Sequence, residues 1–230
     1  TIDKRAAVIG LEPLPGSRIE AENIAGILKA DDAFENAILF VESAGTESSF
    51  RSLSGNEISI LHIATHGFYN TNEESGSSLF YLLRQEAEDK VLARSGLFLA
   101  GAENNLLGYG NDASEDDGIL TAMEISTLDF RYVDLATLSA CQTAQGDITG
   151  DGVYGLQRGF KKAGAESILM SLLKVDDEAT CFLMTEFYRN WIGEGKTKHA
   201  ALEAAKQAVR SKKNKGWDKP EYWAAFILLD

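Results

Sequence analysis

The sequence predicts an α/β fold with a mainly parallel central sheet. Two short apolar runs, residues 58–64 and 133–140, are rich in β-branched and aliphatic side chains and are bounded by small or turn-forming residues. Such continuous apolar runs are typical of strands buried on both faces. Segments with helical spacing separate these runs from others of the same kind, which indicates βαβ crossovers and helices on both faces of the sheet.

The first part of the chain alternates between strand and helix patterns. Residues 19–28 have helical spacing, with Ser17 placed to act as the N-cap. A short helix is predicted around residues 50–53. Two apolar runs predict strands at residues 6–10 and 37–41.

The middle of the chain is less regular. Thr121 and Glu124 have the spacing of a capping box, which predicts a short helix over residues 120–125. The segments before this helix are predicted as a polar loop at 70–78, short strands or a hairpin at 81–88 and 96–101, and an acidic, turn-prone loop at 111–118.

Regular alternation returns in the last third of the chain. A Gly-rich turn at 145–152 leads into a helix predicted to end at Gly164. The predicted elements from there on are a helix at 153–163, a strand at 167–173, helices at 177–191 and 197–211, and a closing strand at 223–229. Because there is no internal repeat, linker or second apolar core pattern, we expect one domain over residues 1–230.

The amino-acid composition of the chain limits the classes of function that we expect. The 230 residues carry a formal net charge of −13, which argues against direct nucleic-acid binding and suits either a basic partner or solubility alone. No run approaches the length of a membrane helix and no signal peptide is visible, so a cytoplasmic location is expected. The two cysteines do not form a disulfide framework. A first residue of Thr rather than Met suggests a fragment of a longer chain.

Two reactive side chains stand at the ends of predicted strands. His66 follows the 58–64 run, and Cys141 follows the 133–140 run. Reactive groups collect beyond the carboxyl ends of strands in open α/β sheets, so this thiol and imidazole are a candidate nucleophile and acid/base pair. The alternatives are a buried apolar cysteine at a strand end and a hydrogen-bonded structural histidine.

An ordered set of motifs resembles the CHAT domain, a caspase-like module of the clan CD cysteine peptidases that is related to separase. The resemblance covers nearly the whole chain and implies a caspase-like α/β/α sandwich. The motifs are Leu14-Pro15-Gly16, Leu61-His62-Ile63-Ala64-Thr65-His66-Gly67, Asp117-Gly118-Ile119-Leu120-Thr121, Leu138-Ser139-Ala140-Cys141-Gln142-Thr143-Ala144, Gly155-Leu156-Gln157-Arg158-Gly159-Phe160 and Trp223-Ala224-Ala225-Phe226-Ile227. Leu173-Lys174 departs from the Trp-Pro that family members often carry.

The resemblance implies a cysteine endopeptidase. Cys141 would be the nucleophile and His66 the acid/base, with the backbone N–H groups of Gly67 and Cys141 available to an oxyanion. The partners implied are a protein or peptide substrate and a regulatory protein or fused tetratricopeptide repeats. The alternatives are a non-catalytic caspase-like interaction module and a nucleotide-binding α/β domain, the latter disfavoured because phosphate-binding motifs are missing.

Specificity has two readings in the sequence. Asp176 and Asp177 follow the predicted strand at 167–173, where an acidic pocket would favour Arg or Lys before the cleaved bond. Asp176 is also a natural N-cap, and Asp177 suits a helix's first turn. Arg18 is the basic residue nearest the first strand's carboxyl end, which is weak support for a pocket that binds Asp.

The remaining candidates have structural interpretations. His62 could orient loops near the site but is favoured as a hydrogen-bonded structural histidine, His199 is expected to be peripheral, and Cys181 to be a packing residue. Residues 147–158 begin like a calcium loop, but Arg158 stands where the required Glu would be. No His/Cys cluster has zinc spacing and no phosphate-binding motif is present, so we expect no metal and no cofactor. The alternative is a different calcium site in the acidic loops.

Overall fold

The computed structural model describes residues 11, 14–69, 90–107, 116–139, 141–142, 150–173 and 175–230. For residues 69, 90, 141–142 and 150–153 the description covers the backbone. The predicted strand at 6–10 and the predicted segments 70–78, 81–88, 111–115 and 145–149 lie outside these ranges.

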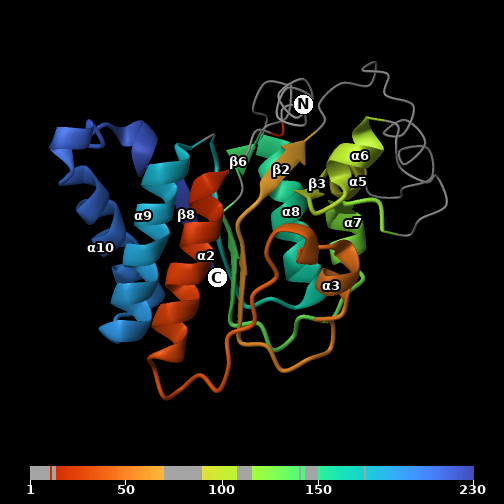
Figure 1. The fold of residues 1–230 in the computed structure, drawn as a ribbon, viewed down its shortest axis with the longest axis horizontal. Coiled ribbons are helices and arrows are strands. Elements are labelled where there is room, and N and C mark those ends of the chain that lie inside the picture. Colours follow the sequence, from red (N-terminus) through yellow and green to blue (C-terminus); the bar gives the residue numbers. More distant parts are fainter. Residues whose placement is uncertain are drawn as a thin grey trace.

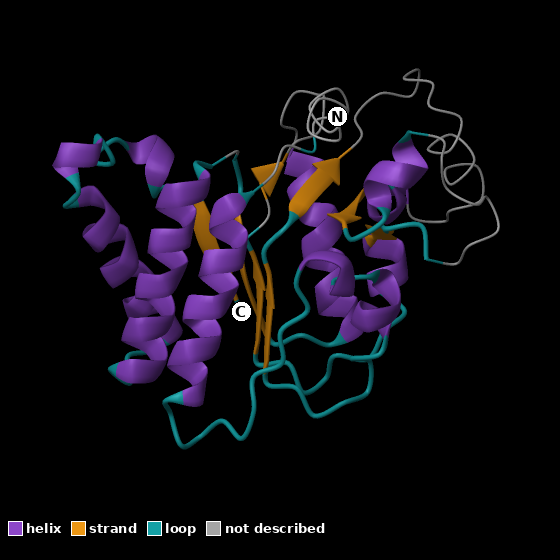
Figure 2. Ribbon diagram, in the orientation of Figure 1, coloured by secondary structure: helices purple, strands orange, loops and turns teal. Residues whose placement is uncertain are grey.

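Sheet A is mainly parallel and forms the centre of the fold. Its strand order is β1-β5-β7-β8, in which β1, β5 and β7 run parallel and β8 is antiparallel to β7. The strands are β1 (Ile60–Ile63), β5 (Leu135–Leu138), β7 (Ser167–Ser171) and β8 (Phe226–Leu229). Figure 2 shows these strands standing between two groups of helices.

Helices cover both faces of sheet A, which confirms the predicted α/β class (Figure 1). One face carries α2 (Pro15–Lys29), α9 (Asp177–Tyr188) and α10 (Lys198–Arg210). The other face carries α3 (Glu47–Arg51), α7 (Ala122–Ile125) and α8 (Gly150–Ala163). The shorter elements are η1 (Glu42–Ala44), α5 (Lys90–Ala93), α6 (Ala102–Leu106), the π-helical turn η2 (Arg189–Gly193), η3 (Lys213–Lys215) and η4 (Pro220–Tyr222).

Sheet B continues two strands of sheet A beyond their carboxyl ends. Its order is β4-β3-β2-β6, and the strands are β4 (Ile119–Thr121), β3 (Ser95–Phe98), β2 (His66–Tyr69) and β6 (Cys141–Gln142). β2 follows β1 after two residues, and β6 follows β5 after two residues. β2 pairs parallel with β6 and antiparallel with β3.

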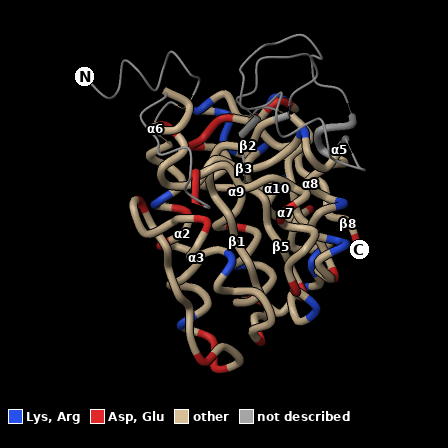
Figure 3. Tube along the Cα trace, turned by 90° about the vertical axis from the view of Figure 1, so that its right-hand side faces the viewer, with Lys and Arg blue, Asp and Glu red and all other residues tan. Residues whose placement is uncertain are grey.

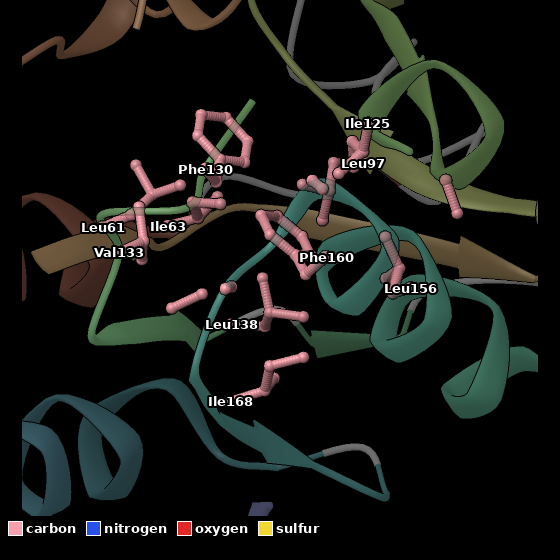
Figure 4. Packing of buried hydrophobic residues seen from close by; sticks show 14 of the residues in the cluster. Leu61, Ile63, Leu97, Ile125, Phe130, Val133, Leu138, Leu156, Phe160 and Ile168 are labelled. Atoms are coloured by element: carbon pink, nitrogen blue, oxygen red, sulfur yellow. The ribbon is translucent and has the colours of Figure 1, made fainter. Parts of the chain in front are cut away.

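Each face of sheet A contributes to its own apolar core, because successive side chains of a strand point to opposite faces. Leu61 and Ile63 of β1 pack with Leu138, Phe160 and Ile168 beneath α8 (Figure 4). Leu135 and Leu169 pack on the other face, against residues of α2, α9 and α10. The strands β1 and β5 carry no Lys, Arg, Asp or Glu, and the charged residues lie on the surrounding elements (Figure 3).

Two local predictions are wrong. The run 37–41 is not a strand, and Ile38 and Phe40 are 68% and 42% exposed. An apolar run indicates that a segment tends to be buried. A strand also needs a neighbouring strand to pair with, and the sequence pattern does not show whether there is one. Ser17 is not the N-cap of α2, because the helix begins earlier, at Pro15. The fixed φ of proline suits a first helical position, and the Ser17 hydroxyl instead donates to the Leu14 carbonyl at 2.7 Å.

Several local predictions are confirmed. α7 begins with a capping box in which Thr121 Oγ1 accepts from the Glu124 N–H and Glu124 Oε2 accepts from the Thr121 N–H. α8 ends at Ala163, and Gly164 follows with a φ of +105°, a left-handed conformation that glycine adopts without strain.

Candidate active site

β1 and β5 are neighbours in sheet A and carry the two candidate reactive residues at their carboxyl ends. Their parallel register pairs His62 with Thr137 and Ile63 with Leu138. Beyond these pairs the Ser139 N–H donates to the Ile63 carbonyl at 2.9 Å, so the two chains stay joined past the last ladder position. The two strands therefore leave sheet A side by side.

His66 and Cys141 are partners in register where the two chains form β2 and β6. Neighbouring strands lie about 4.8 Å apart, so the backbones that carry the imidazole and the thiol are in direct contact. The pairing of His62 with Thr137 and that of His66 with Cys141 have the same spacing along both chains. The predicted meeting of His66 and Cys141 at one rim of the sheet is thus found at the level of the backbone.

The imidazole of His66 is half-buried, with Nδ1 shielded from solvent. The residue before it is anchored to sheet B, because Thr65 Oγ1 donates to the Phe98 carbonyl at 2.5 Å. On the side away from Cys141, His66 is the register partner of Phe98 in β3. Strands on both sides therefore hold the histidine backbone.

Gly67, predicted to offer a backbone N–H to an oxyanion, is buried inside sheet B. It lies between Leu97 of β3 and Gln142 of β6, its two register partners. A backbone flanked by strands on both sides is rigid, and its polar groups are near those of the ladder. The N–H of Gly67 therefore lies in the plane of the sheet, with a strand on each side of it, rather than on the sheet's face.

Asp176 and Asp177 both lie at the start of α9, beyond the carboxyl end of β7. Asp176 is exposed and caps the helix, with Oδ1 accepting from the Ala179 N–H at 2.9 Å. Asp177 is half-buried, and its Oδ2 accepts from the Gly16 N–H at 2.6 Å. A Cβ on Gly16 would lie 2.7 Å from the Asp177 carboxyl group, so this contact requires glycine. Both carboxylates therefore have structural roles.

Two other sequence candidates, Arg18 and His199, are exposed and lie beside carboxylates. Arg18 is exposed and forms ion pairs with Glu22 and Glu42. His199 is exposed in the first turn of α10, 3.7 Å from a carboxylate oxygen of Asp230.

Cys181 is half-buried in α9, and its environment suppresses thiolate formation. Burial, together with the negative charges of Glu20 and Asp177, raises the pKa of the Cys181 thiol to about 11. A thiol with this pKa is largely protonated at neutral pH and is a poor nucleophile. Cys181 is therefore disfavoured as a nucleophile, and its expected packing role stays a prediction.

A buried polar network on the α2–α9 face includes three residues that were not predicted as site candidates. Glu20 Oε1 lies 2.7 Å from His62 Nε2, His62 Nδ1 lies 3.3 Å from the Tyr188 hydroxyl, and that hydroxyl lies 2.9 Å from Thr137 Oγ1. The sequence feature that could have identified Glu20 is its position, because it is a carboxylate on the apolar side of its helix. Tyr188 and Thr137 carry no comparable signal, because each is ordinary in a buried helix or strand.

Among the residues that the structure describes, no group of three or more His, Cys, Asp and Glu side chains is arranged to hold a metal ion. Within the same residues, no helix combines the length and the apolar character needed to span a bilayer.

Comparison with protein-family models identifies the family of this chain. The CHAT domain family model matches residues 3–229. The chain belongs to the CHAT domain family. Its mixed α/β fold with a mainly parallel sheet is consistent with the caspase-like fold that the resemblance implied.

Two relatives of this CHAT domain are named as tetratricopeptide repeat proteins. The chain is 36% identical over 112 residues to tetratricopeptide repeat protein 28 of Mus musculus and 34% identical over 111 residues to that of Homo sapiens. Each match covers 48% of this chain and 4% of the relative's length. The chain therefore corresponds to a small part of these relatives.

Proposed function

We propose that this CHAT domain is a cysteine endopeptidase that works through a dyad of Cys141 and His66. The observation that carries the proposal is the register pairing of these two residues on the adjacent strands β2 and β6, beyond the carboxyl ends of β1 and β5. In open α/β sheets this rim is where reactive side chains meet a ligand. Membership of the CHAT domain family adds support.

The proposed chemistry follows from the two side chains. The Cys141 thiolate attacks the scissile carbonyl carbon, and the carbonyl electrons move onto oxygen to give a tetrahedral oxyanion. His66 protonates the departing amine as the intermediate collapses to a thioester, a role for which histidine is the commonest residue. Water then attacks the thioester and releases the acid product. The backbone N–H groups of Gly67 and Cys141 are the proposed oxyanion donors.

The proposed specificity rests on the two carboxylates at the start of α9. Asp176 and Asp177 place negative charge beyond the carboxyl end of β7, which would favour Arg or Lys before the cleaved bond. Each carboxylate already accepts a backbone hydrogen bond, from Ala179 and Gly16 respectively. A carboxylate oxygen accepts more than one hydrogen bond, so these structural roles are compatible with binding a cationic side chain.

We also propose that residues 1–230 act as one peptidase domain, in the cytoplasm, under the control of a partner or of fused repeats. The support for fused repeats is the name of the relatives, which are tetratricopeptide repeat proteins. Domains fused to repeats can be held inactive or activated by what the repeats bind, because loops at catalytic rims move between open and ordered forms.

Covalent labelling separates a peptidase from a non-catalytic interaction module. The chain is incubated at pH 7 with peptidyl acyloxymethyl ketones that carry Lys, Arg, Leu or Asp at the reactive position, and labelled residues are located by mass spectrometry. We expect one label on Cys141 and none on Cys181, whose raised pKa keeps its thiol protonated. Cys181→Ala should leave labelling intact, and Cys141→Ala should abolish it.

The matched histidine variant tests the dyad within the same assay. His66→Ala should slow Cys141 labelling by about 10²-fold or more, because it removes the acid/base partner. Labelling of Cys141 that is slow, insensitive to the peptide portion and unchanged by His66→Ala would instead indicate an interaction module with an ordinary thiol.

A further inference from the structure

The buried network around Tyr188 joins four elements, three of them through one hydroxyl group. Its members are Glu20 in α2, His62 in β1, Thr137 in β5 and Tyr188 at the end of α9. The side chains of Glu20 and His62 are 2% and 9% exposed, and Tyr188 and Thr137 are fully buried. The rings of His62 and Tyr188 also meet edge to face, with centroids 5.5 Å apart.

The hydroxyl of Tyr188 is a neutral bridge between the two strands. Burial raises the pKa of Tyr188 above its ordinary value, so the phenol keeps its proton. It lies 3.3 Å from His62 Nδ1 and 2.9 Å from Thr137 Oγ1, with one proton to donate and lone pairs to accept. Because buried polar groups need partners, loss of either contact would leave a buried group unsatisfied.

The two residues that share this hydroxyl are register partners. His62 is paired with Thr137, and four residues farther along each chain His66 is paired with Cys141. Four residues of strand span about 13 Å, so the bridge lies close to the rim but does not touch it. A slip of one residue between β1 and β5 would turn either His62 or Thr137 to the opposite face of the sheet. The hydroxyl can therefore serve both residues in this register and not in a slipped one.

We propose that Tyr188 is a positioning residue: through His62 and Thr137 it fixes the alignment of β1 with β5 and, through the continuous chains, that of His66 with Cys141. Glu20 contributes by holding Nε2 of His62, which sets the orientation of the imidazole toward Tyr188. The inference rests on the proposed function for its catalytic consequence. Its structural part, the alignment of the strand ends, stands independently.

The test uses the reactivity of Cys141 rather than substrate turnover. All chains carry Cys181→Ala, so Cys141 is the single thiol. The second-order rate of alkylation by iodoacetamide is measured at pH 6.5 by intact mass, with and without His66→Ala. The ratio of the two rates is the enhancement that His66 supplies. Because misplacement by about 1 Å can lower a reaction rate about 10²-fold, we expect Tyr188→Phe to reduce this ratio at least about tenfold.

A control on the same helix separates alignment from general loss of stability. Thr185→Val also removes a buried hydroxyl from α9, one that donates to the Cys181 carbonyl at 2.8 Å and lies 3.3 Å from Asn23 Nδ2 rather than contacting a strand. This variant should lose stability yet keep the His66 enhancement. If Tyr188→Phe does not fold, Thr137→Val repeats the test with the phenol in place. An enhancement unchanged in Tyr188→Phe or Thr137→Val would overturn the proposal.

Hydrogen exchange distinguishes failure of this proposal from failure of the proposed function. If Cys141 alkylation does not depend on His66 even with Tyr188 present, the dyad fails. The alignment role is then decided at the Ser139 amide, which bonds the Ile63 carbonyl between the strand ends. Faster exchange of this amide in Tyr188→Phe but not in Thr185→Val supports the role, and equal exchange in the two variants refutes it.

Discussion

At the scale of single residues, the two cysteines lie in different parts of the fold. Cys181 is held in an environment that raises its thiol pKa to about 11, with the charges of Glu20 and Asp177 adding to the effect of burial. Cys141, in contrast, is the register partner of a histidine at the end of a parallel strand. Position within the fold thus gives two identical residues different surroundings.

The buried carboxylate of Glu47 predicts a measurable pH dependence of the stability of the fold. Its side chain is 1% exposed, Oε1 accepts from the Gly118 N–H at 2.7 Å, and Oε2 pairs with Arg51 at 2.6 Å. Burial is the main cause that raises its pKa from 4.5 to about 7. The Gly118 N–H and the charge of Arg51 oppose this rise, and the charges of Asp117 and Glu124 contribute to it. The folded state therefore binds this proton more tightly than the unfolded chain does.

The sign of the effect follows from this tighter proton binding. The contribution of Glu47 to stability is fully present below about pH 4.5 and is lost as the pH rises to about 7. Relative to Glu47→Gln, the unsubstituted chain should lose up to about 3 kcal/mol of unfolding free energy between pH 4.5 and pH 8. Urea denaturation of both chains at several pH values measures this difference, and parallel stability profiles would contradict the prediction.

At the scale of elements, α9 both packs against the sheet and begins at the candidate pocket. Asp176 caps the helix, so its substitution tests the two roles separately. Asp176→Ala should cost about 1 kcal/mol of unfolding free energy, whereas Asp176→Asn, which keeps an acceptor, should stay within about 0.5 kcal/mol of the unsubstituted chain. Equal stability of the Ala variant would contradict the capping role, and a weaker preference for Arg or Lys in the otherwise stable Asn variant would support the pocket.

An element is predicted correctly from the sequence where the residues that determine it lie close together along the chain. The capping box of Thr121 and Glu124 and the glycine after α8 are local signals, and both are confirmed. The strand predicted at residues 37–41 is wrong because strand formation depends on a neighbouring strand that is distant in sequence. The start of α2 was misplaced because Pro15 suits the first helical turn as well as Ser17 suits a cap.

The candidate site is predicted by the sequence in part. His66 and Cys141 could be placed at one rim because the parallel-sheet rule acts on strand ends. Their pairing in register could not be predicted, because apolar patterns carry no information on which residues of two strands face each other. Tyr188 was missed for the same reason, since its hydroxyl gains a role only when α9 packs on β1 and β5.

At the scale of the whole molecule, two apolar cores hold sheet A between two helical layers (Figure 1). Sheet B extends from the carboxyl ends of β1 and β5, so the candidate dyad lies where the two sheets join. The two candidate residues follow the ends of β1 and β5, outside the two apolar cores.

Cleavage of a peptide library varied at the residue before the cut tests the central claim most directly. The chain, Cys141→Ala and His66→Ala are compared, alone and within the whole protein that contains this chain. We predict cleavage by the unsubstituted protein, loss of cleavage in Cys141→Ala, and a rate at least about 10²-fold lower in His66→Ala. Cleavage that survives Cys141→Ala, or no cleavage by the whole protein, would contradict the assignment of a Cys141–His66 dyad.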